Sequence, residues 1–161
     1  MTPPDESPAP EKYPWRFPPP GRLIGRGHPA GDFLEAHDWT LEHEGDGELV
    51  VLAHLPDRAR NPRGQLFGGF TPTYVDLMAL LTVRAGKERT ATPRWLATTN
   101  LRVDYLAPVL GPTFRIRSRL VHRGSRSYLV EIRFFDLEER PLVFALTTML
   151  EVRSKGELGD A

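Results

Sequence analysis

The feature that most restricts the fold of this chain is an apolar run that follows a pair of glycines. Gly68 and Gly69 precede a segment, residues 74–85, that leaves almost no polar face. Pro72 suits the first turn of a helix, where a missing N–H group costs little. Because a helix that is apolar nearly all round is buried, we expect one long, buried central helix through this run, with Gly86 at its C-terminal end.

One acidic residue, Asp76, lies inside the apolar run, about two turns after the glycines at roughly 3.6 residues per turn. Aspartate is a poor residue for the middle of a helix, and an unpaired carboxylate is costly to bury. The position therefore indicates either a buried hydrogen-bond partner or a carboxylate that faces a cavity and takes part in chemistry.

Composition excludes several classes of protein. The chain has 161 residues, which suits one domain with a real core, and its formal net charge of zero gives no case for nucleic acid or a membrane surface. It has no cysteine, which rules out disulfides and cysteine nucleophiles. No apolar run is long enough to span a membrane, and the N-terminus lacks the pattern of a signal peptide, so we expect a cytoplasmic protein.

Short strands surround the predicted helix. Two candidates precede it and form a hairpin around Gly45-Asp46-Gly47. Four more follow with short connections, which predicts antiparallel pairing in a meander, with the last strand inside the sheet. Alternation in the first of these four places Thr98 on the face opposite Leu101. The candidates are Trp39–Glu44, Glu48–Leu55, Leu96–Leu106, Phe114–His122, Ser127–Asp136 and Pro141–Val152.

The order of these elements predicts an α+β fold, in which an antiparallel sheet wraps around one buried helix. We divide the chain into an N-terminal arm (1–22), a domain (23–153) and a polar C-terminal tail (154–161). The arm is rich in proline and is expected to be extended or disordered, although Tyr13, Trp15 and Phe17 could instead dock on the body or on a neighbouring subunit. A short helix is expected to end near Glu35.

These residues resemble a known family. The spacing Asn61-x-x-Gly64-x-x-Phe67-Gly68-Gly69, with Asp76 seven residues after the second glycine, is similar to the signature of hotdog-fold acyl-CoA thioesterases. The likeness extends from about residue 33 to residue 152. The segment 98–109 resembles the phenylacetate-pathway type, in which a histidine usually precedes the glycines. Phe67 in that place resembles the broad-range bacterial acyl-CoA thioesterases.

The resemblance implies a hydrolase with the hotdog fold and assigns roles to the central motif. Asp76 would be the general base or a carboxylate nucleophile, against the simpler reading that it accepts a buried hydrogen bond. Gly68 would supply an oxyanion-hole N–H at the helix N-terminus. Gly69 is the fallback donor, although it could serve only close packing.

The resemblance implies further site residues, and two of them, Asn61 and Thr98, have an alternative interpretation. Asn61 would orient the thioester carbonyl or the water, although an asparagine before proline is also a common turn former. Thr98 would position the water, with Thr99 adjacent to it in the sequence. Phe67 and Phe70 would line the apolar path of the acyl group.

Coenzyme A presents phosphates, which arginine forks suit. Arg63, Arg123 and Arg126 are the candidate phosphate-binding residues, whereas the arginines at positions 115, 117 and 119 suit a solvated outer face. The five histidines show no metal-binding spacing. We expect no metal and no cofactor other than coenzyme A as part of the substrate.

The leading hypothesis is therefore an acyl-CoA thioesterase that forms a homodimer or a dimer of dimers (a homotetramer), with Asp76 and Asn61 meeting across the subunit interface. A non-catalytic acyl-CoA-binding module or assembly scaffold on the same fold is the alternative. A hotdog dehydratase ranks last, because no histidine lies near the helix motif in the sequence.

Overall fold

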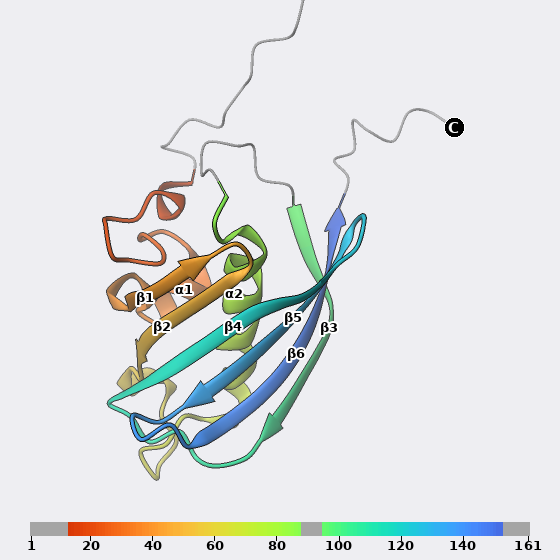
Figure 1. Cartoon of the computed structure of the whole chain (residues 1–161). Helices are drawn as coiled ribbons and strands as arrows, with labels where there is room; N and C mark the ends of the chain where they lie inside the picture. The colour runs from red at the N-terminus through yellow and green to blue at the C-terminus, as the bar shows by residue number, and fades with distance from the viewer. Residues whose placement is uncertain (1–12, 88–94, 153–161) are drawn as a thin grey trace, which may run out of the picture.

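The computed structural model describes residues 13–87 and 95–152, and it confirms the hotdog fold. A six-stranded antiparallel sheet has the order β1-β2-β4-β5-β6-β3, and the helix α2 lies against one face of it (Figure 1). A short helix, α1 (Pro29–Phe33), precedes the sheet as expected. The strands are β1 (Thr40–Gly45), β2 (Glu48–His54), β3 (Trp95–Tyr105), β4 (Thr113–Arg123), β5 (Ser127–Phe135) and β6 (Pro141–Val152), and α2 is Thr71–Arg84.

The prediction of a four-stranded meander is wrong for the first of its strands. β4, β5 and β6 are consecutive neighbours, and β6 is interior as predicted, but β3 pairs with β6 and β4 pairs with β2. The connection of residues 106–112 therefore crosses the end of the sheet (Figure 1). Seven extended residues reach about 23 Å, whereas three strand spacings are only about 14 Å. A short connection therefore does not require the strands that it joins to be neighbours.

The core is centred on the first half of α2. The ring of Tyr74 is fully buried and stacks on Trp39 with centroids 5.4 Å apart. It also meets Phe114 and Phe134 edge to face. The Tyr74 hydroxyl donates to the His54 carbonyl at 2.9 Å, which satisfies the polar tip of an otherwise apolar contact. These contacts fix the rotation of α2 on the sheet.

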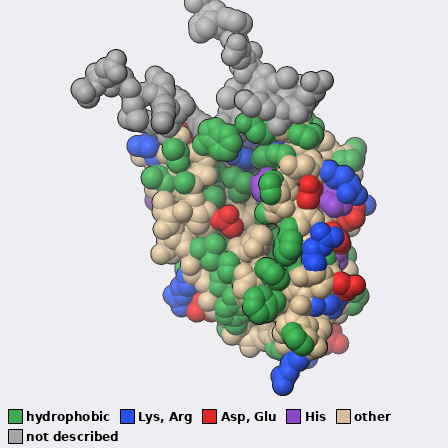
Figure 2. All heavy atoms as spheres, turned by 180° about the vertical axis from the view of Figure 1, so that it is seen from behind, with side chains coloured by type: hydrophobic (Ala, Val, Ile, Leu, Met, Phe, Trp, Pro, Cys, Tyr) green, Lys and Arg blue, Asp and Glu red, His purple; other side chains and the backbone are tan. Residues whose placement is uncertain are grey.

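α2 is not buried all round, contrary to the expectation from its composition. Asp76 is exposed, and Leu80 and Arg84 are half-buried. Positions four apart lie on one face of a helix, so these three residues form a stripe that the sheet does not cover. Seen from behind, the face opposite that of Figure 1 carries many hydrophobic side chains (Figure 2). An exposed apolar face of this kind is typical of an interaction or ligand site.

A β-bulge in β3 changes which side chains face the helix. The pairing with β6 shifts register between Thr98 and Asn100, so Thr99 is the additional residue. Thr98 contacts α2 before the bulge, and Leu101 packs on the core after it. The predicted alternation, which put these two residues on opposite faces, is therefore wrong, because a bulge adds one residue and reverses the alternation beyond it.

The described part of the predicted arm, residues 13–22, packs on the domain. A 3-10 turn, η1 (Pro14–Arg16), carries Trp15, which packs against the core. The Trp15 carbonyl accepts from the Gly25 amide at 2.8 Å, and its ring meets His28 edge to face at 4.9 Å. Tyr13, Trp15 and Arg16 of this segment line one pocket together with Leu80 and Arg84 of α2. In the described ranges, no helix is long and apolar enough to cross a membrane.

Candidate active site

The paired glycines form the entry to α2. A 3-10 turn, η4 (Gly68–Phe70), runs directly into the helix at Thr71. The Phe67 carbonyl accepts from the Phe70 amide at 2.9 Å, and the Gly68 carbonyl accepts from the Thr71 amide. Because each peptide unit is planar, these two bonds also set the directions of the Gly68 and Gly69 N–H groups. The first N–H groups of a helix have no intrahelical acceptor and favour negative charge.

Tyr105 holds this turn from the end of β3. Its hydroxyl donates to the Gly68 carbonyl at 2.7 Å, and its ring lies 3.7 Å from the point where a Gly68 Cβ would be. Sequence reasoning missed this role, because a bond between residues 37 apart depends on the tertiary fold. Strand alternation, which puts Tyr105 on the same face as Leu101 and Val103, could have indicated that Tyr105 lies on the helix side of the sheet.

Asp76 and Thr98 are brought together. The Thr98 hydroxyl donates to Asp76 Oδ1 in a short hydrogen bond. Thr99, the alternative, points elsewhere and donates to the Thr148 carbonyl at 3.2 Å. The bulge in β3 thus separates the two threonines and leaves Thr98 as the one that contacts the carboxylate.

Asn61 closes its own loop. Its Oδ1 accepts from the amides of Arg63 at 2.9 Å and Gln65 at 3.1 Å, as in the turn-forming alternative. Gly64 has φ +75°, which explains the glycine in this loop. The loop is anchored by Arg60, whose guanidinium donates to the carbonyls of Gly64 and Leu55 at 2.9 and 3.0 Å. The Arg60 anchor was not predicted.

Phe67 and Gly69 form one packing unit at the mouth of the site. Phe67 is 50% exposed, and its ring meets Phe70 edge to face at 5.3 Å. A Cβ on Gly69 would lie 2.6 Å from the Phe67 ring, so only glycine lets this ring lie where it does. Gly69 therefore has a packing reason of its own, and the Phe67 ring keeps one half of its surface exposed.

The three candidate phosphate-binding arginines are not gathered at one place. Arg63 lies on the Asn61 loop and is exposed. Arg123 and Arg126 flank the turn between β4 and β5. Arg126 donates to the Glu151 carbonyl at 2.9 Å, which ties two strand ends together, and Arg123 lies 3.5 Å from Asp46. Within the described ranges, no three metal-ligating side chains cluster.

Two titratable groups beyond Asp76 line the uncovered side of α2. Burial lowers the pKa of His28 below its usual 6.5, and the Arg84 charge adds to the effect, whereas Asp32 and Asp76 oppose it. Burial and the nearby Arg16 lower the pKa of Arg84 to about 10. His28 is therefore near the helix in space, although it is distant from it in the sequence.

Comparison with known proteins identifies the family and supports the fold. The family model for the thioesterase superfamily matches residues 63–143, which are 81 of the 161 residues. No curated protein matches the chain. A hypothetical thioesterase from Streptococcus pneumoniae, solved with coenzyme A, is 22% identical with a TM-score of 0.62, over 73% of this chain and 89% of that one.

Two further solved structures share the fold. The PaaI protein of the E. coli phenylacetic acid degradation operon is 12% identical with a TM-score of 0.65, over 80% of this chain and 87% of that one. A thioesterase from Haemophilus influenzae is 15% identical with a TM-score of 0.65, over 77% and 82% of the two chains. With the family model matching half of its length, the chain belongs to the thioesterase superfamily.

Proposed function

We propose that this protein hydrolyses acyl-CoA thioesters to a free acid and coenzyme A, with Asp76 as the catalytic carboxylate. The observation that carries the proposal is the position of Asp76. It is the acidic residue on the stripe of α2 that the sheet leaves uncovered, and the Thr98 hydroxyl holds one of its oxygens. The other carboxylate oxygen can accept a proton from water or attack a carbonyl carbon.

Either role of Asp76 gives a balanced reaction. As general base, Asp76 takes a proton from water while the water oxygen bonds to the thioester carbon, and the carbon–sulfur bond then breaks. The proton passes to the departing thiolate. As nucleophile, an Asp76 oxygen bonds to the thioester carbon, the carbon–sulfur bond breaks, and coenzyme A leaves as a thiolate. Water then hydrolyses the mixed anhydride, which releases the acid, restores the Asp76 carboxylate and supplies the proton that the thiolate takes up. In both routes Thr98 orients the carboxylate.

The charge that develops on the carbonyl oxygen needs preorganised donors. The Gly68 N–H group is our first candidate and the Gly69 N–H group is the second, since both belong to the fixed turn at the N-terminus of α2. Asn61 is proposed to contact the carbonyl or the water through its second Nδ2 proton, because its Oδ1 is engaged in the loop and its Nδ2 already donates to Gln65 Oε1 at 3.4 Å. Phe67 and Phe70 would line the path of the acyl group.

The separation of these groups along one helix supports a dimeric site. Gly68 and Asp76 are eight residues apart, which is about 12 Å at 1.5 Å per residue. A carbonyl held about 3 Å from each group cannot bridge that distance. We therefore propose that the turn and Asn61 of one subunit work with Asp76 of the other. Among the described strands β3, eleven residues long, is an edge strand of the sheet, which supports pairing between two sheets.

Coenzyme A is proposed as the leaving group because two structures of the same fold were solved with coenzyme A or with its acetyl thioester. The Streptococcus pneumoniae thioesterase was solved with coenzyme A, and a Streptococcus mutans protein, 23% identical with a TM-score of 0.60, was solved with acetyl-CoA. Arg63 and Arg123 are the phosphate-binding candidates, with Arg126 as a third whose guanidinium is partly used by the Glu151 carbonyl.

The test is release of free thiol from a panel of acyl-CoAs by the wild-type protein and by Asp76→Ala. Asp104→Ala is the matched control, because Asp104 is another partly exposed acid, lies on β3 as Thr98 does, and pairs with Arg102 at 3.0 Å. We expect loss of turnover in Asp76→Ala and near-normal turnover in the control. Turnover by Asp76→Ala equal to the wild type would refute the assigned site. No turnover by the wild type, with acyl-CoA still raising its melting temperature, would favour a binding module.

A further inference from the structure

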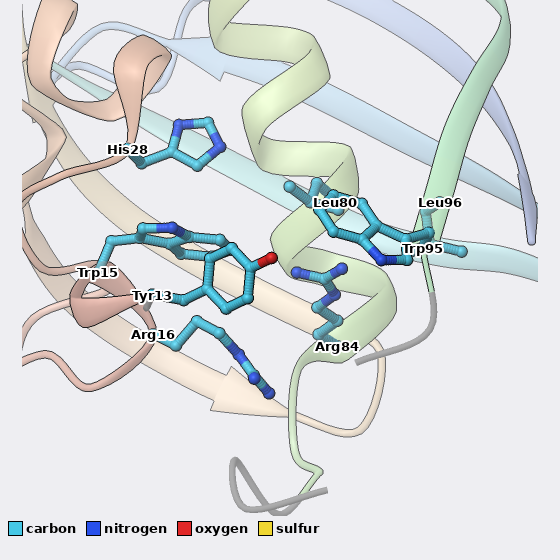
Figure 3. Close-up of a pocket in the computed structure, with 8 residues that line it drawn as sticks. All are labelled: Tyr13, Trp15, Arg16, His28, Leu80, Arg84, Trp95 and Leu96. Carbon is cyan, nitrogen blue, oxygen red and sulfur yellow. The ribbon is translucent and has the colours of Figure 1, made fainter. Parts of the chain in front are cut away.

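A pocket opens beside α2, further along the helix than Asp76. Its volume is about 100 Å³. The docked N-terminal segment, α2 and the start of β3 form most of its wall (Figure 3). α2 contributes Leu80 and Arg84, and β3 contributes Trp95 and Leu96. The pocket therefore lies between two elements that also carry residues of the candidate active site.

The pocket continues the surface that presents Asp76. Leu80 lies four residues after Asp76 on α2, and Leu96 lies two residues before Thr98 on β3, ahead of the bulge. Residues four apart on a helix and two apart on a strand share a face. An acyl group whose thioester carbon lies at Asp76 can therefore extend along this face into the pocket.

Three aromatic rings form a continuous wall across the pocket. Tyr13 meets Trp15 edge to face with ring centroids 6.4 Å apart, and it meets Trp95 in the same way at 6.2 Å. We name these three residues the aromatic bridge, because Tyr13 joins the N-terminal segment to the start of β3. In Figure 3 the Tyr13 ring lies between the other two, at the level of Arg84 rather than of Leu80 along the helix. The bridge therefore lies at the end of the pocket that is far from Asp76.

The N-terminal part of the bridge is fixed to the domain. Trp15 packs on the core, and its carbonyl accepts from the Gly25 amide at 2.8 Å. A Cβ on Gly25 would lie only 3.2 Å from the Trp15 Cα, so glycine allows this close approach. Further along the segment, the Arg22 guanidinium donates to the Asp38 carbonyl at 2.6 Å. Because the segment is held at several points, its rings form a wall of fixed position.

The lining suits an apolar occupant of limited size. Beside the bridge, Leu80 and Leu96 present aliphatic side chains, and the stems of Arg16 and Arg84 present methylene groups. A cavity of about 150 Å³ holds benzene, which has six carbons. By this measure, a volume of about 100 Å³ holds about four carbons of an acyl chain.

The distance from Asp76 sets the length of chain that reaches the bridge. Leu80 lies about 6 Å beyond Asp76 along the helix, and an extended chain advances about 1.2 Å per bond. About five bonds therefore carry the chain from the thioester carbon to the level of Leu80, and about four further carbons fill the pocket. A decanoyl group meets the aromatic bridge, and a longer chain has to displace it.

We propose that this pocket binds the far end of a linear, apolar acyl chain and that the aromatic bridge limits this chain to about ten carbons. The inference rests on the proposed thioesterase function and adds a determinant of substrate length to it. The chemical step stays as described for Asp76, because the pocket contacts only the unreactive end of the chain.

The experiment measures kcat/KM by thiol release for hexanoyl-, decanoyl- and tetradecanoyl-CoA. Each methylene that enters the pocket should raise kcat/KM by up to about fourfold, so the wild-type value should rise from hexanoyl-CoA to decanoyl-CoA. It should then fall by about tenfold at tetradecanoyl-CoA, because the last carbons overfill the pocket. A value that continues to rise to tetradecanoyl-CoA would overturn the inference while leaving the thioesterase intact.

Variants of the bridge locate the limit. Tyr13→Ala removes the central ring and should raise the ratio of kcat/KM for tetradecanoyl-CoA to that for hexanoyl-CoA by about tenfold or more, as for two or more newly buried methylenes. Trp95→Ala should shift this ratio in the same direction. It decides the question if Tyr13→Ala does not fold, because Trp95 is 62% exposed and its removal disturbs the core little.

Phe17→Ala is the matched control. Phe17 is an exposed aromatic residue of the same segment and is not one of the described residues that line the pocket, so this variant should keep the wild-type ratio. An unchanged ratio in folded Tyr13→Ala would overturn the inference. An equal loss of kcat/KM for all acyl-CoAs leaves the ratio unchanged and counts as this outcome, since it would place Tyr13 against coenzyme A or in the fold alone.

A binding measurement separates this inference from the proposed function. If the wild type hydrolyses none of these acyl-CoAs, the proposed function fails, and calorimetric titration then tests the pocket. An affinity that rises to decanoyl-CoA and falls at tetradecanoyl-CoA, with the fall lost in Tyr13→Ala, would still support the inference. Equal affinities for all chain lengths would refute it.

Discussion

Removal of a single hydroxyl group tests whether the turn at the start of α2 is preorganised for catalysis. Tyr105→Phe deletes the donor that lies 2.7 Å from the Gly68 carbonyl but leaves the ring against Gly68. The carbonyl keeps its bond from the Thr71 amide. The loss of stability should therefore be at the lower end for a hydrogen bond, about 0.5–1 kcal/mol.

The effect on catalysis should be larger than this stability change indicates. The Gly68 carbonyl and the Gly69 N–H group belong to one planar peptide unit, so they rotate together. When the carbonyl loses the Tyr105 hydroxyl as a donor, the peptide unit is held less firmly and the direction of the Gly69 N–H group varies more. Deleting a whole oxyanion donor costs about 10²–10³ in kcat. Loosening one should cost about tenfold, with little change in KM because the substrate contacts remain.

The assay is thiol release at saturating and limiting acyl-CoA, which separates kcat from KM. Tyr128→Phe is the matched control, because its hydroxyl contacts Glu151 at 3.5 Å near the opposite end of β3. Urea denaturation of both variants measures the stability term. A normal kcat for Tyr105→Phe, or a rise in KM alone, would show that Tyr105 does not position the oxyanion donors.

Three further substitutions are informative. Thr98→Val removes the hydroxyl that donates to Asp76 and should lower kcat about tenfold, whereas Thr99→Val should leave kcat unchanged. Equal effects of the two substitutions in thiol-release assays would contradict the conclusion that Thr98, and not Thr99, acts with the carboxylate. Tyr74→Phe leaves the His54 carbonyl without its hydroxyl donor and should lower the free energy of unfolding in urea by about 1–2 kcal/mol, and an unchanged value would contradict this packing role. His28→Asn keeps a side chain that can cap the N-terminus of α1 but removes the imidazole, which is the group that titrates. Because the folded-state pKa of His28 is below 6.5, the unfolded chain binds more protons near that pH, and the wild type should lose stability as pH falls below 6.5 while the variant lacks this loss. Parallel pH dependences in urea denaturation from about pH 5 to 7.5 would refute it.

The central helix and the fold could be predicted because their signals are local. The glycine pair, Pro72 and the apolar run are contiguous, and the glycine-centred hairpin of β1 and β2 has its own turn signal. The strand order could not be predicted, because a seven-residue connection is long enough to reach several neighbours. The bulge at Thr99 was also hidden, because alternation alone does not indicate where a strand gains a residue.

The candidate site likewise has features that the sequence predicts and features that only the tertiary fold shows. The family resemblance assigned both Asp76 and Thr98 to the site, but their hydrogen bond to each other was not predicted. The exposure of Asp76 was not predicted either, because composition does not say which stripe of a helix the sheet leaves open. The Tyr105 bond and the pocket depend on residues from distant parts of the chain. The roles of Gly68 and Asn61 stay predictions, since they concern groups that act on a substrate.

The docked N-terminal segment has a consequence for how this protein can change. Trp15 and its neighbours contribute one wall of the pocket but no strand of the sheet and no part of the Asp76–Thr98 pair. Substitutions at the exposed positions of this segment can therefore reshape one wall of the pocket while the six strands of the sheet and the Asp76–Thr98 pair keep their sequence.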